Sequence, residues 1–241
     1  MASLKWAGTR RLRWVSAEPA RDQPQIEITE QGPYRVSGGV PLAGTSQVET
    51  EYGEPIDWAP LEPISAGRRY SLCRCGRSSS KPFCDDSHEQ VEWEGTEVAD
   101  RAPRDSRADL FPGDGVVMTD DHSFCTHAGY CGDRFVKVWD LIDRTSDPAI
   151  RERLKHMVDL CPSGTLDHRA SIVAPADEPA FDKGIAVAAD GPLWVRGGVT
   201  LRSADGSTYE IRNRVTLCRC GHSANKPFCD GTHKDIGFRD P

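Results

Sequence analysis

The sequence has no long hydrophobic run and no excess of basic residues. Its longest mostly apolar stretches are strand-sized, far short of the roughly 20 residues of a membrane-spanning helix, so a soluble protein without a membrane span is expected. Lys and Arg total 30 against 37 Asp and Glu, a formal net charge of −7. A general nucleic-acid-binding domain is strongly basic, and nucleic acid is therefore not an expected partner.

Signatures of catalysis and of secretion are also missing. No phosphate-cradling glycine loop and no acid–base carboxylate pair occurs in a supporting context, which argues against an enzyme. The start of the chain lacks the apolar core of a secretory signal. Residues 1–17 are basic without a single acid, so an organelle-targeting segment is the alternative to the cytoplasmic location expected by default.

The number of cysteines is nine, which is odd. A disulfide framework favours an even number and a secreted context, whereas thiolates in a reducing compartment are typical metal ligands. Metal binding is therefore the first functional hypothesis. The cysteines fall into three groups of three: Cys73, Cys75 and Cys84; Cys125, Cys131 and Cys161; Cys218, Cys220 and Cys229.

The chain contains an internal repeat. "GPYRVSGGVPL" at 32–42 returns as "GPLWVRGGVTL" at 191–201, and "LCRCGRSSSKPFCDDSH" at 72–88 returns as "LCRCGHSANKPFCDGTH" at 217–233. In both copies a short alternating run leads to Gly-Gly, the pattern of a half-buried strand that ends in a turn or bulge. Two β-units too small to bury their own faces are expected to pack against each other about a pseudo-twofold axis, as an internal pair in a monomer.

Other segments are read from their proline and glycine content. The connection at 55–63 contains three prolines and is expected to be a surface loop. The stretches 99–115 and 174–184 are rich in proline and charge and are expected to be linkers. The fold class expected is α+β and β-rich. The predicted domains are a first repeat unit at 1–100, an insertion at 101–176 and a second repeat unit at 177–241.

The repeated strings have the residue types of a metal site. Cys73 and Cys75 are one residue apart, so in a turn both thiolates can reach one metal, while Cys84 and His88 can serve a second metal. Three cysteines and a histidine are also a legitimate zinc set, but structural zinc sites usually use C-x(2–4)-C spacing. A catalytic Cys-His pair, with one cysteine as nucleophile, does not require two further cysteines. Buried structural thiols do not explain the same spacing twice.

The strings at 72–88 and 217–233 resemble the signature C-x-C-x2-S/T-x3-P-x-C-D-G-S/A/T-H of the CDGSH iron–sulfur domain family, which includes mitoNEET. Ser78 and Pro82 lie at the signature positions of the first string, and Ser223 and Pro227 at those of the second. The resemblance implies one [2Fe–2S] cluster per motif beneath a small β-structure. It implies Cys73 and Cys75 on one iron with Cys84 and His88 on the other, and in the second copy Cys218 and Cys220, then Cys229 and His233.

One position departs from the signature. The glycine after the Cys-Asp step is kept as Gly231 but is Asp86 in the first copy. As the first residue of a short helix an aspartate is sterically acceptable and suits the helix dipole. It also adds negative charge beside a cluster, so the first site is expected to have the lower reduction potential.

The segment between the repeats carries the third group of cysteines. A helix is predicted from Asp147 as N-cap and Pro148 as first helical residue, with an apolar face, up to Cys161. The segment resembles divergent single-cluster ferredoxin domains in its first cysteines, its helix and its "CPSG" ending. Since a [4Fe–4S] cluster ordinarily takes four cysteines, the options are a [3Fe–4S] cluster, a [4Fe–4S] cluster with a ligand such as His127, a zinc ion or no metal.

These observations predict an iron–sulfur protein that transfers electrons or clusters or senses redox state. Its expected partner is a redox or cluster-acceptor protein. Two other functions remain open: a zinc-binding interaction module, and an electron-relay subunit of an oxidoreductase complex.

Overall fold

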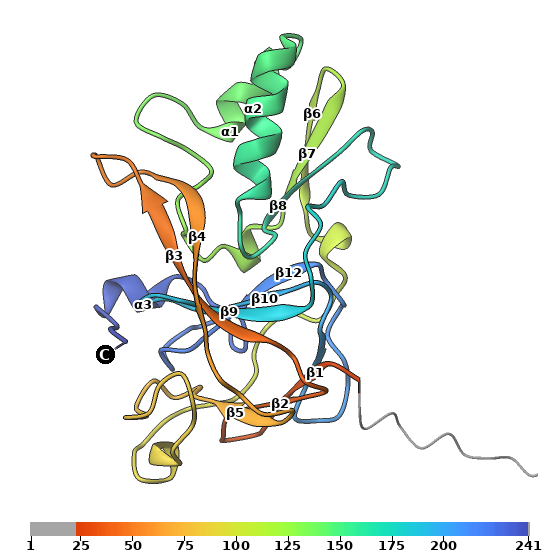
Figure 1. The fold of residues 1–241 in the computed structure, drawn as a ribbon. Helices are drawn as coiled ribbons and strands as arrows, with labels where there is room; N and C mark the ends of the chain where they lie inside the picture. Colours follow the sequence, from red (N-terminus) through yellow and green to blue (C-terminus); the bar gives the residue numbers. More distant parts are fainter. Residues whose placement is uncertain (1–22, 241) are drawn as a thin grey trace, which may run out of the picture.

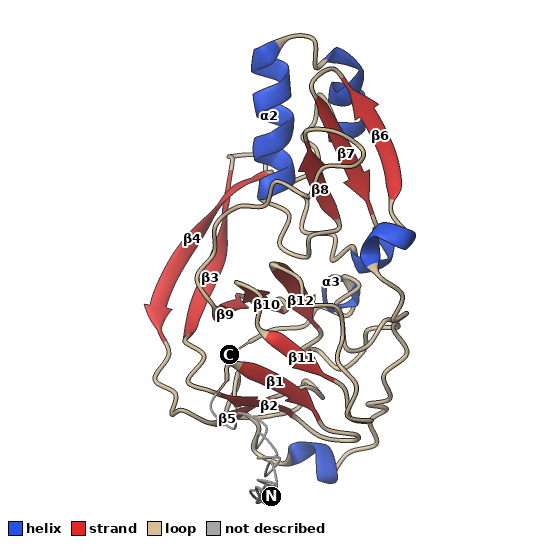
Figure 2. Ribbon diagram, turned by 90° about the vertical axis from the view of Figure 1, so that its right-hand side faces the viewer, coloured by secondary structure: helices blue, strands red, loops and turns tan. Residues whose placement is uncertain are grey.

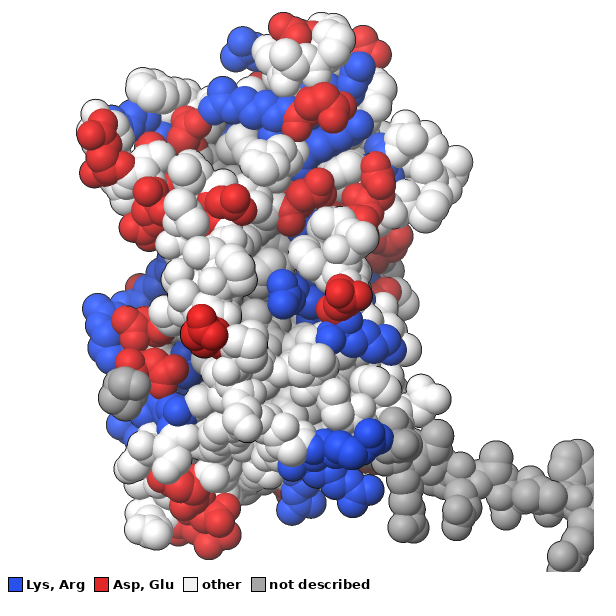
Figure 3. Space-filling model, viewed as in Figure 1, with Lys and Arg blue, Asp and Glu red and all other residues white. Residues whose placement is uncertain are grey.

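The computed structural model describes residues 23–240, so the basic segment considered for targeting, residues 1–17, lies outside the described residues. Figures 1 and 2 show a β-rich body with a smaller insertion at one end, where the long helix stands beside a third sheet. Within the described residues no helix is long and apolar enough to cross a membrane. Acidic and basic side chains are interspersed on the face shown in Figure 3.

Two mixed sheets form the body. The first has the order β11-β1-β2-β5, and the second has the order β12-β10-β9-β3-β4. The strands of the first repeat unit are β1 (Gln25–Ile28), β2 (Tyr34–Ser37), β3 (Leu42–Glu49), β4 (Pro55–Pro63) and β5 (Tyr70–Leu72). Those of the second are β9 (Gly184–Ala188), β10 (Leu193–Arg196), β11 (Thr200–Arg202) and β12 (Arg214–Leu217).

The two repeat units exchange one strand. Strand β11 of the second unit pairs in parallel with β1, with Ile26 opposite Leu201, and β3 of the first unit pairs in parallel with β9, with Ala43 opposite Ala186. Each sheet therefore holds three strands of one unit and, next to them, the third strand of the other, in the same pairing order; the second sheet also holds β4, which follows β3 at its edge. The apolar residues of both units fill one shared core, as expected for units too small to bury their own faces.

The repeated Gly-Pro segments form β2 and β10, as predicted. Gly-Gly follows each strand with positive φ angles, 83° and 71° at Gly38 and Gly39. Strand β2 alternates between buried and exposed residues, whereas β10 is buried on both faces. The difference arises because Trp58 packs on Trp194 with ring centroids 4.9 Å apart.

The expectation of a surface loop at 55–63 was wrong, because these residues form strand β4. The strand lies at the edge of its sheet and pairs only with β3, with register shifts at two places. An edge strand tolerates proline because one side of its backbone forms no ladder. The three prolines therefore fit a strand that ends the sheet.

The insertion has its own core and antiparallel sheet, in the order β6-β7-β8. Its strands are β6 (Asp109–Gly113), β7 (Val116–Asp120) and β8 (Leu166–Arg169), and its helices are α1 (Val138–Leu141) and α2 (Pro148–Asp159). Short 3-10 turns span Ser87–Glu89, Arg104–Ser106, His122–Phe124 and Ile142–Arg144, and α3 spans Thr232–Asp235.

Helix α2 confirms the sequence prediction at its start. The side chain of Asp147 accepts a hydrogen bond of 2.8 Å from the backbone N–H of Ala149, and Pro148 is the first helical residue. Leu154 and Val158 are buried on the predicted apolar face. The expected linker at 99–115 is in part structured, since it contains β6 and the buried Arg104.

Candidate metal centres

The first repeated string brings its four predicted ligands together as two pairs. The sulfurs of Cys73 and Cys75 lie 3.8 Å apart, and the Cys84 sulfur lies 3.5 Å from Nδ1 of His88. The chain folds back after β5, where Leu72 bridges to Phe83. This fold-back places Cys84 beside the strand that leads into Cys73.

The second string repeats this geometry. The sulfurs of Cys218 and Cys220 lie 3.8 Å apart, and the Cys229 sulfur lies 3.4 Å from Nδ1 of His233. The backbone N–H of Cys218 donates to the Pro227 carbonyl at 2.8 Å, as that of Cys73 does in the first copy. The structure thus brings the eight predicted ligands together as four close pairs, two in each string.

The spacing of the donors favours two metal ions at each site. Ligands on one tetrahedral zinc, with bonds of about 2.3 Å, lie about 3.8 Å apart. Each pair has that spacing, but the four donors of a motif do not form one such group. Among residues 23–240, the single group of three or more donor side chains lying within 4.8 Å of one another is Cys84, Asp86 and His88. A pair of irons, each held by one donor pair, fits this arrangement.

Other signature residues shape the two loops. Ser78 donates a hydrogen bond of 2.7 Å to the Phe83 carbonyl, and Ser223 donates to the Phe228 carbonyl at the same distance. Asp85 accepts the backbone N–H of Ser79 at 2.7 Å, and its counterpart Asp230 does the same for Ala224. The serine and aspartate thus tie the two halves of each loop together.

The arginine inside each C-x-C step was not singled out from the sequence. Arg74 is buried and donates to carbonyls of the β1–β2 turn, including Thr29 at 2.6 Å. Arg219 is buried too and donates to Ala188 at 2.8 Å and Gly191 at 3.0 Å in the β9–β10 turn. The sequence signal was the identical residue at this position in both copies.

The two cysteine loops contact each other through their backbones. Gly76 and Gly221 have positive φ angles, 77° and 84°. A Cβ added to Gly76 would lie 2.4 Å from the Cys220 carbonyl oxygen, and one added to Gly221 would lie 2.4 Å from the Cys75 carbonyl oxygen. The side chain of Tyr34 also crosses between units and donates to the Cys218 carbonyl at 2.9 Å.

Burial and neighbouring sulfurs set the protonation of the donors. The sulfur–sulfur hydrogen bond within each C-x-C pair lowers the pKa of Cys73 and of Cys218. Burial raises the pKa of Cys229 to about 12 and lowers the pKa of His233 to about 4. Metal ligands must be deprotonated, so loading these sites releases protons from cysteines whose pKa is raised, such as Cys229, while His233 is already neutral at pH 7.

Asp86 does not occupy the position expected from the sequence. It precedes the 3-10 turn as N-cap residue, rather than starting the helix, and its φ of 64° lies in the left-handed region. Gly231 takes the same position with a φ of 89°. In this left-handed conformation an aspartate has a higher conformational energy than a glycine. Its carboxylate oxygen lies 3.7 Å from the Cys84 sulfur, which confirms negative charge beside the first site.

The three cysteines of the insertion also come together. Cys125, Cys131 and Cys161 line one cavity of about 200 Å³, together with His122 and His127. Burial raises the pKa of Cys125, and it raises the pKa of Cys131 to about 11. The cavity therefore offers three thiols and two imidazoles in a largely apolar pocket.

Three arginines, of which Arg104 and Arg214 are buried, hold the loop that carries Cys161. Arg214 of β12 donates to the Cys161 carbonyl at 2.9 Å and to the Asp159 carbonyl at 2.6 Å, at the end of α2. Arg104 donates to the Thr165 carbonyl and Arg212 to the Gly164 carbonyl, at 2.7 and 2.6 Å. No local sequence pattern indicates these bonds. Those from Arg212 and Arg214 link the insertion to the second repeat unit, and that from Arg104 lies within the insertion.

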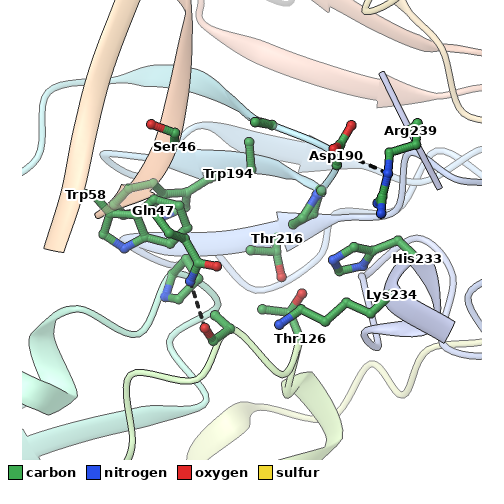
Figure 4. A pocket seen from close by; sticks show the side chains of 16 residues that line it. Ser46, Gln47, Trp58, Thr126, Asp190, Trp194, Thr216, His233, Lys234 and Arg239 are labelled. Carbon is green, nitrogen blue, oxygen red and sulfur yellow. Dashed lines mark hydrogen bonds and ion pairs between the residues drawn. The ribbon is translucent and has the colours of Figure 1, made fainter. Parts of the chain in front are cut away.

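A second cavity, of about 210 Å³, lies beside His233 (Figure 4). Thr126 lines this cavity and the cysteine-lined cavity of the insertion. In Figure 4 the side chain of Gln47 reaches the backbone of the insertion loop, where it donates to the Ala128 carbonyl at 2.7 Å. The loop that follows Cys125 therefore separates the middle site from the second repeated site.

Comparison with protein families agrees with this layout. Residues 31–89 and 190–234 match the model described as iron-binding zinc finger CDGSH type. Residues 111–171 match the model described as divergent 4Fe-4S mono-cluster. No curated protein and no solved structure gives a significant match.

Proposed function

We propose that this chain, which carries two iron-binding CDGSH segments on either side of a divergent 4Fe-4S mono-cluster domain, is an electron-carrier or cluster-transfer protein. Each CDGSH site takes one [2Fe–2S] cluster, and the middle site takes a [4Fe–4S] cluster. The partner is a redox or cluster-acceptor protein, and the chain works as a monomer because its two units already form a pair. It does not itself convert a substrate.

The observation that carries the proposal is the division of each ligand set into two pairs. Cys73 and Cys75 would hold one iron, and Cys84 and His88 the other, with the same assignment in the second copy. A [2Fe–2S] cluster accepts and returns one electron, and a histidine ligand in place of a thiolate raises its potential. Backbone N–H groups of Arg77 and Asp86 donate to the sulfurs of Cys75 and Cys84, as they would to thiolates bound to iron.

The middle site has a ligand set for part of a [4Fe–4S] cluster. Cys125, Cys131 and Cys161 supply three thiolates, and His122 and His127 are the imidazoles that line the same cavity. Three sites in one chain also support the second candidate function, an electron-relay subunit of an oxidoreductase complex. That function would show as co-purification with a partner and as turnover that requires this chain.

The proposal is tested by reduction and by cluster transfer. Purified protein is reduced stepwise with dithionite, and EPR spectra are recorded at each step. In a second experiment, oxidised protein is mixed with an apo-ferredoxin as cluster acceptor. We expect reversible one-electron signals from two [2Fe–2S] clusters, or transfer of their visible absorbance to the acceptor. A colourless protein that shows neither would refute the proposal and would favour a zinc-bound interaction module.

Asp86 provides a prediction about the two potentials. We expect Asp86→Asn to raise the reduction potential of the first site, because it removes a negative charge 3.7 Å from the Cys84 sulfur. Asn tolerates the left-handed conformation, so stability should change little. Asp86→Gly should raise the potential and also stabilise the fold by about 1 kcal/mol. The measurements are a redox titration and urea unfolding, and a wild-type first site at the higher potential would contradict the charge argument.

A further inference from the structure

The two CDGSH sites have the same ligands but differ in burial. In the first site Cys84 and His88 are half-buried and Asp86 is exposed. In the second site Cys229 is 2% exposed and His233 is 6% exposed. The difference is confined to the Cys-His pair, since the C-x-C cysteines are buried in both copies.

A loop of the insertion accounts for the burial of the second site. Residues 125–130, which we name the covering loop, pass over it. The Thr126 hydroxyl is buried and donates a hydrogen bond of 3.0 Å to the Cys229 sulfur. The His127 ring packs on Gly231, where an added Cβ would lie 2.6 Å from Cδ2 of the ring. Lys234 of α3 donates to the His127 carbonyl at 2.6 Å.

This contact explains why the glycine of the signature is kept in the second copy. A side chain at Gly231 would collide with His127. At the equivalent position of the first copy Asp86 points its exposed carboxylate toward Cys84. Gly231 therefore leaves room for the covering loop at the second site, whereas Asp86 fills the equivalent position of the first site.

The covering loop is joined to the middle site at both ends. Cys125 opens the loop and Cys131 follows its last residue, and both side chains line the middle cavity. The backbone N–H of His127 donates to the Cys125 sulfur at 3.4 Å, and His127 has a φ of 54°. Metal bonds to Cys125 and Cys131 would fix both ends of the loop, which lowers the entropy cost of holding Thr126 on Cys229.

We propose that the covering loop slows release of the cluster from the second CDGSH site, an effect that we call the lock, and that metal binding at the middle site strengthens the lock. Cluster transfer then takes place at the first site, and loading of the middle site controls how firmly the second site retains its cluster. Thr126 is the positioning residue, because its hydroxyl joins the loop to a ligand sulfur. The coupling is reciprocal, so a loaded second site also favours loading of the middle site. The inference rests on the proposed function.

The test follows the release of iron from the intact, loaded protein to a ferrous or ferric chelator at constant neutral pH. We expect two phases of [2Fe–2S] absorbance loss, a fast one from the first site and a slow one from the second. The double variant Cys73→Ser, Cys75→Ser assigns them, because it should retain only the slow phase. A single phase in wild-type protein would overturn the proposal.

Variants of the covering loop test the lock itself. Thr126→Val removes the hydrogen bond to the Cys229 sulfur with little change in shape, and should speed the slow phase about three- to tenfold, as loss of one hydrogen bond predicts. Thr126→Ser keeps the hydroxyl and should restore the slow rate. Cys131→Ala, which disables the middle site, should speed the slow phase at least as much as Thr126→Val. The fast phase should be unchanged in all three.

A second readout separates a change at the site from a loss of folding. The EPR spectrum of Thr126→Val should change for one [2Fe–2S] cluster and stay the same for the other. If Thr126→Val and Cys131→Ala both leave the slow phase unchanged, the lock is wrong although the clusters are present. If the wild-type protein binds no iron and no sulfide, the proposed function fails together with the lock.

Discussion

Replacing Gly76 by alanine is expected to destabilise the protein by about 2–5 kcal/mol and to reduce iron loading at both CDGSH sites. Gly76 has a φ of 77°, a conformation that costs an L-residue about 1–2 kcal/mol. Its added Cβ would lie 2.4 Å from the Cys220 carbonyl oxygen, which is backbone and cannot rotate away. The overpacking adds about 1–3 kcal/mol. Because the displaced residue, Cys220, is a proposed ligand of the other site, iron loading should fall at both sites.

The chain offers a control that separates the two costs. Gly53 has a φ of 75°, and a Cβ added there would meet no atom within 4 Å. Gly53→Ala should therefore cost about 1–2 kcal/mol and leave iron loading unchanged. Urea unfolding and iron per chain are the measurements. Equal effects of the two substitutions would show that the cysteine loops do not press on each other.

Mild acid is expected to remove the cluster of the first site before that of the second. A proton competes with iron for the imidazole ligand, whose ordinary pKa is about 6.5. Burial lowers the pKa of His233 to about 4, so this imidazole resists protonation down to that pH. His88 is half-buried and meets solvent more readily. Near pH 5.5 the first cluster should therefore be lost while the second remains.

The sign of the stability change follows from the same pKa. Between pH 6.5 and pH 4, His233 is protonated in the unfolded chain but not in the folded protein. The free energy of unfolding therefore falls as pH falls through this window. The loss begins at the unfolded pKa and is complete near the folded one. The second site thus resists acid through burial, at the expense of overall stability.

Substitutions of single histidines distinguish ligand protonation from general unfolding. His88→Cys should slow the acid-induced loss from the first site, because a bound thiolate competes better with protons than an imidazole does. His156→Ala should change nothing, since His156 is exposed on α2, away from the sites. Visible absorbance after a pH jump gives the rates. Equal rates for wild type and His88→Cys, or earlier loss from the second site, would contradict the account.

The close pairs of the candidate sites were predictable from the sequence, because their information is local. The spacing of Cys73, Cys75, Cys84 and His88 occurs twice, and the structure brings the members of each pair together in both copies. Helix α2 was predictable for the same reason, since its N-cap, first-turn proline and apolar face lie within twelve residues. Asp86 was misplaced, although the glycine in the other copy was the signal for a positive φ.

Features that depend on distant contacts were not predictable. The exchange of β3 and β11 joins strands separated by more than a hundred residues, and no alternating pattern specifies which edge a strand will pair with. Strand β4 was taken for a loop because proline content does not reveal that a strand lies at an edge. Thr126 and Arg214 act on residues of other units, so their roles appear only in three dimensions.

The central claim is that each repeated motif holds two irons bridged by sulfide rather than one tetrahedral ion. The most direct test is to measure iron, acid-labile sulfide and zinc per chain in a variant whose middle cysteines, Cys125, Cys131 and Cys161, are changed to alanine. The account predicts about four irons and four sulfides with negligible zinc. One zinc ion per motif without sulfide would contradict it.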